Sequence, residues 1–259
     1  MNFKLSNQAD IHQMMKDILQ SFNDTFNVIL VDSPDLLQNV YRLRYEVLCL
    51  EKRLPDFNIS QYPNKLEIDE YDSHSAHILL QHRSSGIFIG TVRLILSDPT
   101  YPEKEFPIEK HMCIDKNLLE TKKLPRYHTA EISRFLVGKY FLGRQPVHNL
   151  HKNKSTKCKF IKERKFFPHP ILGLALGIGR MSFVHNISHL LCVMDPALNK
   201  LLGYYGLNFV PIGPLANYHG LRRPYYFDTK LVSKKRHENF QNIWKLITDR
   251  KETWQDIQH

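Results

Sequence analysis

"GIFIGTVRLIL", residues 86–96, is the stretch that decides the fold, because its pattern predicts a β-strand with two apolar faces. The alternating positions of such a strand carry Ile87, Ile89 and Ile95 on one face and Phe88, Val92 and Leu94 on the other. Strands that are apolar on both faces are typical of the centre of a sheet covered by helices on both sides. The segment therefore predicts a layered α/β structure.

The segments around this strand extend the same prediction. Residues 74–81 form a second strand pattern separated by a short polar loop, which favours a hairpin. Residues 33–52 have the pattern of a helix with Ser33 as N-cap and Pro34 at its first position. Further strands are expected at 27–32, 130–137, 189–194, 207–213 and 224–232, and further helices at 8–22, 170–187, 196–206 and 233–250. The order predicts one α/β domain over residues 1–259, with a mixed central sheet flanked by helices.

The composition limits the environment and the partners. The apolar run 171–179 is too short to cross a bilayer, and the chain begins with no apolar leader-like segment. Four cysteines lie far apart without a CxxC pair, so we expect free thiols in a cytoplasm. The formal net charge of +10 favours an acidic partner, and nucleic acid, anionic lipid and acidic protein all stay open on charge alone.

Three arginines lie where apolar patterns predict burial. Arg44 falls on the apolar stripe of helix 33–52, Arg93 lies inside the two-faced strand, and Arg134 lies in strand 130–137 together with Glu131. Buried charges are costly unless they are paired and hydrogen-bonded. The acid-rich segment 66–74 can supply the carboxylates of Glu67, Asp69 and Asp72. The pattern therefore predicts one polar pocket of arginines and acids, or a set of ion pairs that only pins a loop to the sheet.

Strand 130–137 carries a second signal. Regular alternation would place Glu131 and Arg134 on opposite faces. A β-bulge between them would bring both side chains to one side and splay the sheet. A splayed edge offers backbone N–H groups that can hold an extended ligand or a carbonyl oxygen.

These residues together resemble a known family. The segments "RYEVLCLE", "EIDEYDSHSAHILL", "GTVRLIL", "AEISRFLV" and "GLNFVPIGPLANYHGLRRPYY" resemble the exosortase/PEP-CTERM-system-associated acyltransferases over roughly residues 27–232. These are similar to N-acyl amino acid synthases and, more distantly, to acyl-homoserine-lactone synthases, all with a GNAT-like fold. Arg44, the acid cluster, Arg93 and the Glu-x-x-Arg-Phe segment 131–135 match the lactone-synthase pattern. Leu48 stands where that pattern has an aromatic residue, and no tryptophan lies between Arg44 and Glu67, which argues against a lactone synthase in the narrow sense.

The resemblance implies transfer of a fatty acyl group, in particular a long-chain one, from a thioester to the amine of an amino-acid-like acceptor. The absence of a Gly-x-Ser-x-Gly motif agrees with direct attack and no covalent intermediate. Either Glu67 or Glu131 would be the general base, while Arg44, Arg93 and Arg134 would orient the acids or hold an acceptor carboxylate. The remaining substrate-binding residues that we expect are Asp69, Asp72, Phe135, Leu136, Val137, His219 and Arg222. Backbone N–H groups of residues 135–137 would hold the thioester carbonyl.

The basic charge then has a candidate purpose. Residues 144–169 carry eight lysines and arginines against one acid, in an expected insertion at about 139–169. Acyl-carrier proteins are acidic, so we expect this segment to dock the carrier through Lys152, Lys154, Lys157, Lys159, Lys162, Arg164 and Lys165. The glycines of "GLALGIGR", residues 173–180, lie in an apolar helix and indicate close packing more than phosphate binding. The expected donor is therefore an acyl-phosphopantetheine thioester on acyl-carrier protein rather than on coenzyme A, with no bound cofactor and no metal.

Several alternatives remain open at this point. A lactone-type signal synthase would need S-adenosylmethionine as acceptor, and a non-catalytic descendant would only bind acyl-carrier protein. A nucleic-acid-binding module would explain the charge, but the chain has no helix-turn-helix, zinc-finger or RNP motif, so we expect no nucleic-acid partner. The amphipathic helix expected at 233–250 favours docking on the core and leaves peripheral membrane contact open. The sequence does not predict an oligomeric state.

Overall fold

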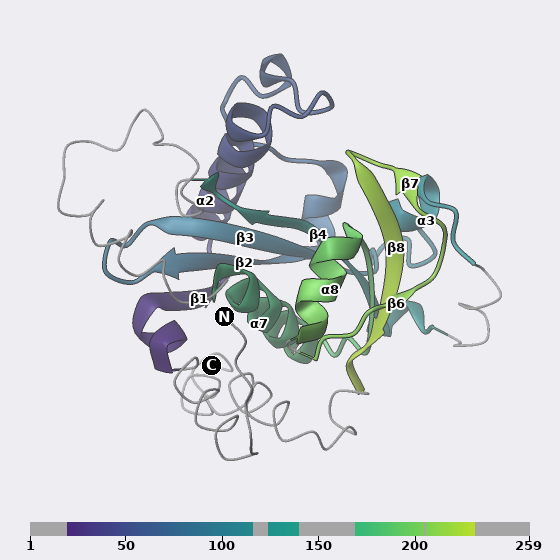
Figure 1. The fold of residues 1–259 in the computed structure, drawn as a ribbon. Helices are drawn as coiled ribbons and strands as arrows, with labels where there is room; N and C mark the ends of the chain where they lie inside the picture. The colour runs from purple at the N-terminus through teal and green to yellow at the C-terminus, as the bar shows by residue number, and fades with distance from the viewer. Residues whose placement is uncertain (1–19, 116–123, 140–168, 205, 231–259) are drawn as a thin grey trace. The chain divides into compact units, whose positions relative to one another are not determined.

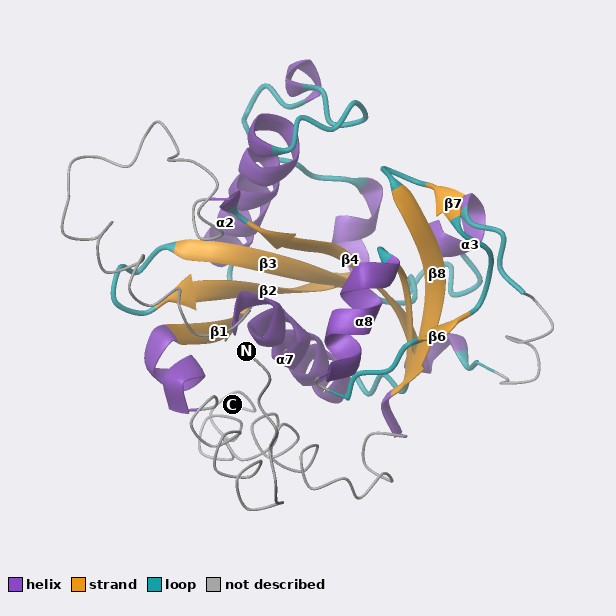
Figure 2. Ribbon diagram, viewed as in Figure 1, coloured by secondary structure: helices purple, strands orange, loops and turns teal. Residues whose placement is uncertain are grey.

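A computed structural model describes residues 20–115, 124–139, 169–204 and 206–230. The chain forms two compact units, which we name after one element of each. The α2 unit comprises residues 25–96 and 132–181, and the β8 unit comprises residues 1–24, 97–131 and 182–259. Strand β4 (Thr129–Val137) and helix α7 (His169–Val184) contribute residues to both. Figure 1 and Figure 2 show the ribbon of these elements.

The α2 unit contains four neighbouring strands in the order β1-β2-β3-β4. Besides β4 and α7, this unit contains β1 (Phe26–Leu30), α2 (Pro34–Tyr45), a π-helix (Glu46–Glu51), two 3-10 helices (Ile59–Gln61 and Glu70–His74), β2 (Ser75–His82) and β3 (Phe88–Ile95). Strands β1, β2 and β3 are antiparallel neighbours, so the predicted hairpin is confirmed.

Helix α2 begins where the sequence predicts. The Ser33 hydroxyl accepts the Leu36 N–H at 3.4 Å, and Pro34 occupies the first turn, where its missing N–H leaves no helical hydrogen bond unmade. The end differs from the expected single helix, because residues 46–51 continue as a π-helix in which the Lys52 N–H donates to the Val47 carbonyl at 2.9 Å. This wider winding buries three consecutive side chains, Val47, Leu48 and Cys49. Segments of π-helix occur frequently at functional sites.

Helices cover both faces of the strands in the α2 unit, as the two apolar faces of β3 predict. Leu79 of β2 belongs to the core cluster formed with Val40 and Leu43 of α2. The adjacent Ile78 points the other way, and a Cβ placed on Gly177 of α7 would lie only 2.7 Å from its side chain. The predicted close packing at this glycine is therefore confirmed, and Figure 1 shows α2 and α7 on opposite sides of β2 and β3.

The β8 unit is built around a long antiparallel strand, β8 (Leu221–Asp228). Strand β5 (His189–Met194) pairs with one edge of β8, and the short strands β6 (Val210–Pro211) and β7 (Ala216–Asn217) also pair with it. This unit also contains α3 (Pro107–His111), a 3-10 turn (Arg126–His128) and α8 (Pro196–Tyr204). The strand expected at 207–213 is reduced to two residues, and the expected strand at 224–232 begins and ends earlier in the chain.

The mixed α/β fold is confirmed, while some expectations fall outside the described residues. These are most of helix 8–22, nearly all of the insertion at 139–169 and the whole of helix 233–250. Residues 20–25 are helical. No helix among the described residues has both the length and the apolar character that a bilayer crossing requires. The organisation of the whole chain as one domain stays a prediction.

Candidate functional site

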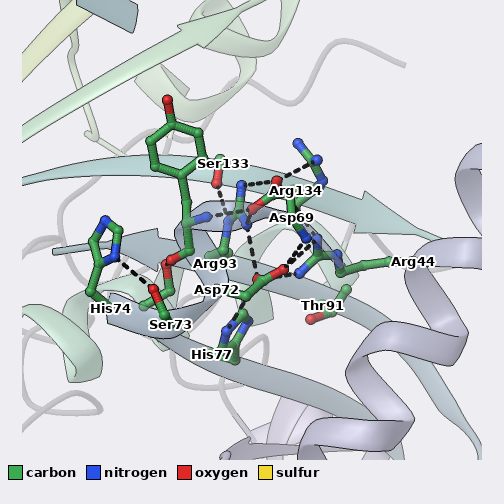
Figure 3. A network of polar contacts seen from close by, with 12 residues as sticks. Arg44, Asp69, Asp72, Ser73, His74, His77, Thr91, Arg93, Ser133 and Arg134 are labelled. Carbon is green, nitrogen blue, oxygen red and sulfur yellow. Dashed lines mark hydrogen bonds and ion pairs between the residues drawn. The ribbon is translucent and has the colours of Figure 1, made fainter. Parts of the chain in front are cut away.

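Three arginines and three carboxylates meet in the α2 unit, on the face of the sheet that α2 covers. We call them the acid–arginine cluster, and it consists of Arg44, Glu67, Asp69, Asp72, Arg93 and Arg134. Figure 3 shows the guanidinium groups of the three arginines directed toward the carboxylates of Asp69 and Asp72. The predicted convergence of arginines and acids is thus confirmed for three arginines and three carboxylates, whose charges balance.

Arg44 occupies the centre of the cluster and is completely buried. Its Nε atom donates to Glu67, while Nη1 and Nη2 donate to the two carboxylate oxygens of Asp72 at 2.6 and 3.1 Å. The cation on the apolar stripe of the helix is therefore paired on two sides. Its guanidinium carbon also lies 5.4 Å from the centre of the Tyr41 ring, a cation–π distance.

Arg93 is held as completely as Arg44. Its Nη1 atom donates to Asp69 at 2.5 Å and to Asp72 at 2.9 Å, and its Nη2 atom donates to Asp69 at 2.9 Å. The remaining Nε–H donates to the Ser133 hydroxyl at 2.8 Å. The Arg93 side chain is 1% exposed. Two acids and one hydroxyl therefore fix its guanidinium in the centre of the sheet.

Arg134 forms the open side of the cluster. Its Nη2 atom donates to Glu67 and to Asp69, both at 2.8 Å, and its Nε atom donates to Glu67 at 3.2 Å. The ring of Phe57 covers one face, with its centre 5.1 Å from the guanidinium carbon. The Arg134 side chain is 20% exposed and that of Asp69 is 26% exposed, whereas Glu67 is 1% exposed.

The backbone of β4 is irregular at Arg134, as the sequence predicts for this strand. Arg134 has φ +51°, in the left-handed region that β-bulges use. The consecutive residues Ser133 and Arg134 both reach the cluster, which regular alternation would forbid. Glu131, which the same bulge was expected to turn toward Arg134, belongs to the β8 unit, and its Oε2 atom accepts the Ile108 N–H at 2.8 Å.

A capping box at the start of a short 3-10 helix positions Asp69 and Asp72, and the loop before it positions Glu67. Asp69 caps the 3-10 helix Glu70–His74, and Asp72 in turn accepts the Asp69 N–H at 2.8 Å. The Glu67 N–H donates to the Tyr41 carbonyl at 3.1 Å, which ties the preceding loop to α2. The acid-rich segment 66–74 therefore has two roles: it supplies the counter-charges for the arginines, and two of its acids form a local capping box.

The arginines keep all three acids ionised. Burial raises the pKa of Glu67, but the charges and hydrogen bonds of Arg134 and Arg44 outweigh it and hold the pKa below the usual 4.5. The pKa of Asp69 is lowered in the same way, mainly by Arg93. Burial also raises the pKa of Asp72, yet the hydrogen bond and charge of Arg44 and the charge of Arg93 bring it down to about 2. Carboxylates held in this way are stable anions and weak proton acceptors.

His77 borders the cluster and is not part of the predicted site. Its ring is 4% exposed, pairs across the strands with Arg93, and has its Nε2 atom 3.7 Å from an oxygen of Asp72. Neither ring nitrogen has a hydrogen-bond partner. Burial lowers the pKa, Asp72 raises it, and the cations of Arg44 and Arg93 lower it further, giving about 3. The imidazole is therefore neutral at physiological pH.

Sequence reasoning missed two members of this neighbourhood. The hydroxyl of Ser133 has no pattern of its own, because alternation assigns it to the face opposite Arg134. His77 lies in the strand pattern 74–81, and no spacing connects it to the arginines. Among the described residues no group of three or more His, Cys, Asp or Glu side chains is arranged to hold a metal ion.

The other predicted residues are placed as follows. Phe135, Leu136 and Val137 continue β4 after Arg134, with Leu136 buried and its two neighbours partly buried. In the β8 unit, His219 is exposed in a hairpin with φ +52°, and Arg222 lies 3.3 Å from Asp195 in an ion pair. The seven basic residues expected to dock a carrier protein, from Lys152 to Lys165, lie outside the described residues.

Comparisons with known proteins identify the fold that carries this cluster. Residues 43–155, which include the whole acid–arginine cluster, match the family model of the acetyltransferase (GNAT) domain. The CoA-dependent acyl-homoserine lactone synthase BjaI, in a structure with MTA, is similar in fold with a TM-score of 0.56 and 15% identity, covering 86% of this chain and 89% of BjaI. The fold is that of the GNAT-type acyltransferases.

Two further structures support the same fold. A structure of BjaI with SAM and isopentyl-CoA gives a TM-score of 0.54, again with 15% identity and coverage of 86% and 89%. TofI, in a ternary complex with an inhibitor and MTA, gives a TM-score of 0.51 with 14% identity, covering 79% of this chain and 91% of TofI. No curated protein is similar to the chain in sequence.

Proposed function

We propose that the protein is an N-acyltransferase, which moves a long-chain fatty acyl group from a phosphopantetheine thioester to the amine of an amino-acid-like acceptor. The observation that carries the proposal is the open side of the acid–arginine cluster. There a guanidinium, Arg134, and a carboxylate, Asp69, lie 2.8 Å apart and are both partly exposed, while the rest of the cluster is buried. Such a pair presents one positive and one negative charge side by side, at the irregular residue of β4.

This pair is complementary to a zwitterion. The acceptor's carboxylate would bind the Arg134 guanidinium, whose hydrogen bonds to the cluster use Nε and Nη2. The acceptor's ammonium would lie beside Asp69. A zwitterion adds no net charge to a cluster that is already balanced, so binding requires no compensating ion. An acceptor without the carboxylate would lose one of the two contacts.

The described carboxylates favour a positioning role over a proton-accepting one. Both oxygens of Glu67 accept hydrogen bonds from arginines, and its pKa is lowered. In our proposal the acceptor therefore loses its ammonium proton to water before attack. The neutral amine nitrogen then bonds to the thioester carbonyl carbon, the carbon–sulfur bond breaks, and the proton that the nitrogen gives up passes, directly or through water, to the leaving thiolate. Glu131 stays a candidate base.

We infer the identity of the acyl donor from the family resemblance and from the basic charge of the chain. The basic residues of segment 144–169 support an acyl-carrier protein as the carrier of the donor. Gly177 packs closely against Ile78, so we assign no phosphate contact to the glycine-rich helix that contains it. Backbone N–H groups of residues 135–137 would hold the thioester carbonyl. The link to exosortase/PEP-CTERM systems, which the resemblance alone suggests, belongs to the same proposal.

A lactone synthase is the second candidate, because BjaI, one of the fold neighbours described above, is an acyl-homoserine lactone synthase. S-adenosylmethionine carries the same zwitterionic head as a free amino acid, so the Arg134–Asp69 pair would suit it equally well. Leu48 and the missing tryptophan argue for the amino acid synthase.

A product screen tests the proposal. Purified protein would be mixed with octanoyl, dodecanoyl and palmitoyl thioesters on carrier protein and on coenzyme A, together with pooled amino acids and S-adenosylmethionine. Mass spectrometry would identify the product while released thiol is measured in parallel. An N-acyl amino acid confirms the proposal, and a lactone replaces it with the second candidate. Folded protein that releases no thiol with any pair contradicts both.

A second measurement tests whether the acceptor binds as a zwitterion. The acceptor found in the screen would be compared with its methyl ester, which keeps the amine and loses the carboxylate charge. We expect kcat/KM to fall by at least tenfold for the ester, with a smaller loss in the Arg134→Gln variant, where the partner of the carboxylate is already gone. Equal rates for acid and ester in the wild type would show that Arg134 does not bind the acceptor.

A further inference from the structure

Two adjacent arginines at the start of β8 have different surroundings. Arg222, one of the expected substrate-binding residues, has its Nη1 atom 3.3 Å from a carboxylate oxygen of Asp195. The other oxygen of that carboxylate accepts the Ala197 N–H at 2.8 Å, in the first turn of α8. Because successive side chains of a strand point to opposite faces, Arg223 is directed to the other face of β8. The acid that pairs with Arg222 is therefore engaged on the opposite side from Arg223.

Arg223 lacks a contact that a buried guanidinium group needs. Its Nε atom is buried, and within the described part of the chain it has no hydrogen-bond partner. An arginine N–H in this position has lost its contact with water and gained no acceptor, which costs free energy. Native structures contain few such groups, so each of them requires an explanation.

A second polar atom on the same side of β8 is in the same condition. The Nδ2 atom of Asn199, in α8, donates to the Phe209 carbonyl at 3.2 Å, whereas its Oδ1 atom is buried and has no partner among the described residues. The ring of Phe209 stacks on the ring of Phe227, with 4.7 Å between their centres. Phe227 lies four residues after Arg223 and so shares its face of β8. A buried donor and a buried acceptor therefore lie on one side of the strand.

Tyr225 connects the two side chains. It lies two residues after Arg223 on the same face of β8 and is buried. Burial raises the pKa of its hydroxyl, while the positive charge of Arg223 and a hydrogen bond with Asn199 act in the opposite direction. Both side chains are thus close enough to influence one hydroxyl group. Arg223 and Asn199 are themselves partly exposed, so a ligand can approach them from solvent.

We propose that Asn199 and Arg223 form a binding site for a secondary amide. Such an amide is planar and carries a carbonyl acceptor and an N–H donor on opposite sides. Its carbonyl accepts a hydrogen bond from Arg223, and its N–H donates to Oδ1 of Asn199. An oxyanion would satisfy Arg223 alone and would place its negative charge beside the Asn199 oxygen.

Two molecules of the proposed reaction carry a secondary amide. One is the donor, whose pantetheine arm contains amide groups, and the other is the N-acyl amino acid product. The choice of these two ligands rests on the proposed function, whereas the amide site itself rests on Asn199 and Arg223.

Calorimetric titration of the full-length protein tests the site without turnover. The probes are pantetheine, N-octanoylglycine and inorganic phosphate, which represent the donor arm, the product and an oxyanion. Arg223→Met removes the guanidinium and keeps most of the aliphatic stem, and Asn199→Leu removes the amide at similar volume. Lys200→Gln is the matched control, because it removes an exposed cation from the helix that carries Asn199.

We expect an amide probe to bind the wild type, with pantetheine indicating a donor site and N-octanoylglycine a product site. Arg223→Met and Asn199→Leu should each weaken this binding by about tenfold or more, the usual effect of a lost hydrogen bond to a buried or charged group. Lys200→Gln should leave it unchanged. The inference is overturned if neither amide binds at millimolar concentration, or if the two variants bind it as the wild type does. Phosphate binding that Arg223→Met abolishes would assign an oxyanion instead and overturn it as well.

Urea unfolding separates a binding role of Arg223 from a structural one. Arg223→Met removes a buried donor that has no partner in the described part of the chain, so the stability of the unliganded protein should stay the same or rise. A clear loss of stability would make Arg223 a structural residue and contradict the inference. Amide binding by a protein that fails the product screen supports the site and contradicts the proposed function alone.

Discussion

Mild acid should destabilise the protein through His77, at a pH well above the range in which Asp72 loses its stabilising charge. The imidazole is buried beside Asp72, Asp69, Arg44 and Arg93, and its folded pKa is about 3 against an ordinary value of 6.5. A histidine with a lowered folded pKa contributes stability that is complete above the unfolded pKa and is lost as the pH falls. The loss from this group therefore begins near pH 6.5 and continues toward pH 3.

The magnitude follows from proton linkage. At pH 5 nearly every unfolded chain carries a proton on this histidine, while the folded chain does not. The difference corresponds to a loss of about 2 kcal/mol in the free energy of unfolding between pH 7 and pH 5, at about 1.4 kcal/mol per pH unit in the steep range. Asp72 adds nothing over this interval, because its stabilisation, with a folded pKa of about 2, is lost only below its ordinary value of 3.8.

Urea unfolding at the two pH values, at constant ionic strength, measures this difference. His77→Phe keeps a ring against Tyr41 and removes the titratable nitrogens, so the loss between pH 7 and pH 5 should shrink by about 2 kcal/mol. His111→Phe, which replaces an exposed imidazole, should leave the loss unchanged. A pH dependence in His77→Phe equal to that of the wild type would refute the neutral, buried state of His77.

Three further predictions concern packing and pairing, and equilibrium unfolding measures all of them. Arg44→Met removes the central cation and leaves two buried acids undercompensated, so it should cost about 3–5 kcal/mol and abolish acyl transfer, whereas Arg42→Met on the exposed side of the same helix should change neither by much. Gly177→Ala should cost about 1–3 kcal/mol, despite the better helix propensity of alanine, because its Cβ would overlap Ile78; unchanged stability would mean that α7 does not rest on β2 at this point. Ser33→Ala should cost about 1 kcal/mol through the lost N-cap, and no measurable cost would show that the 3.4 Å contact contributes nothing.

The sequence predicts the cluster better than it predicts the backbone that builds it. The charges of Arg44 and Arg93 interrupt apolar patterns. Because burying an unpaired charge is costly, each guanidinium must pair with an acid, so this pairing could be predicted. Which oxygen meets which nitrogen depends on rotamers and on the capping box at Asp69, which no pattern encodes. The same limit explains Glu131, which we expected on the same side of the strand as Arg134 and whose carboxylate accepts the Ile108 N–H instead of joining the cluster.

Backbone irregularities were predictable only where alternation failed. The bulge in β4 was anticipated because two charged residues had to share one strand, although its left-handed residue is Arg134 itself. The π-helix at 46–51 gives no such signal, since the apolar run Val47–Cys49 fits an ordinary buried turn. Elements of five residues or fewer, such as α3 and β7, are too short for their periodicity to be detected.

The cost of the acid–arginine cluster is itself an argument for a binding role. Buried ion pairs commonly contribute less to stability than well-packed apolar side chains of similar volume. A sheet face that served stability alone would gain from aliphatic residues at these positions. Arginines and acids with fixed hydrogen bonds instead form an array of charges that need not reorganise when a polar group arrives. The array reaches solvent at Arg134 and Asp69, where our proposal places a ligand with both charges, and the buried pairs behind them hold those two groups in place.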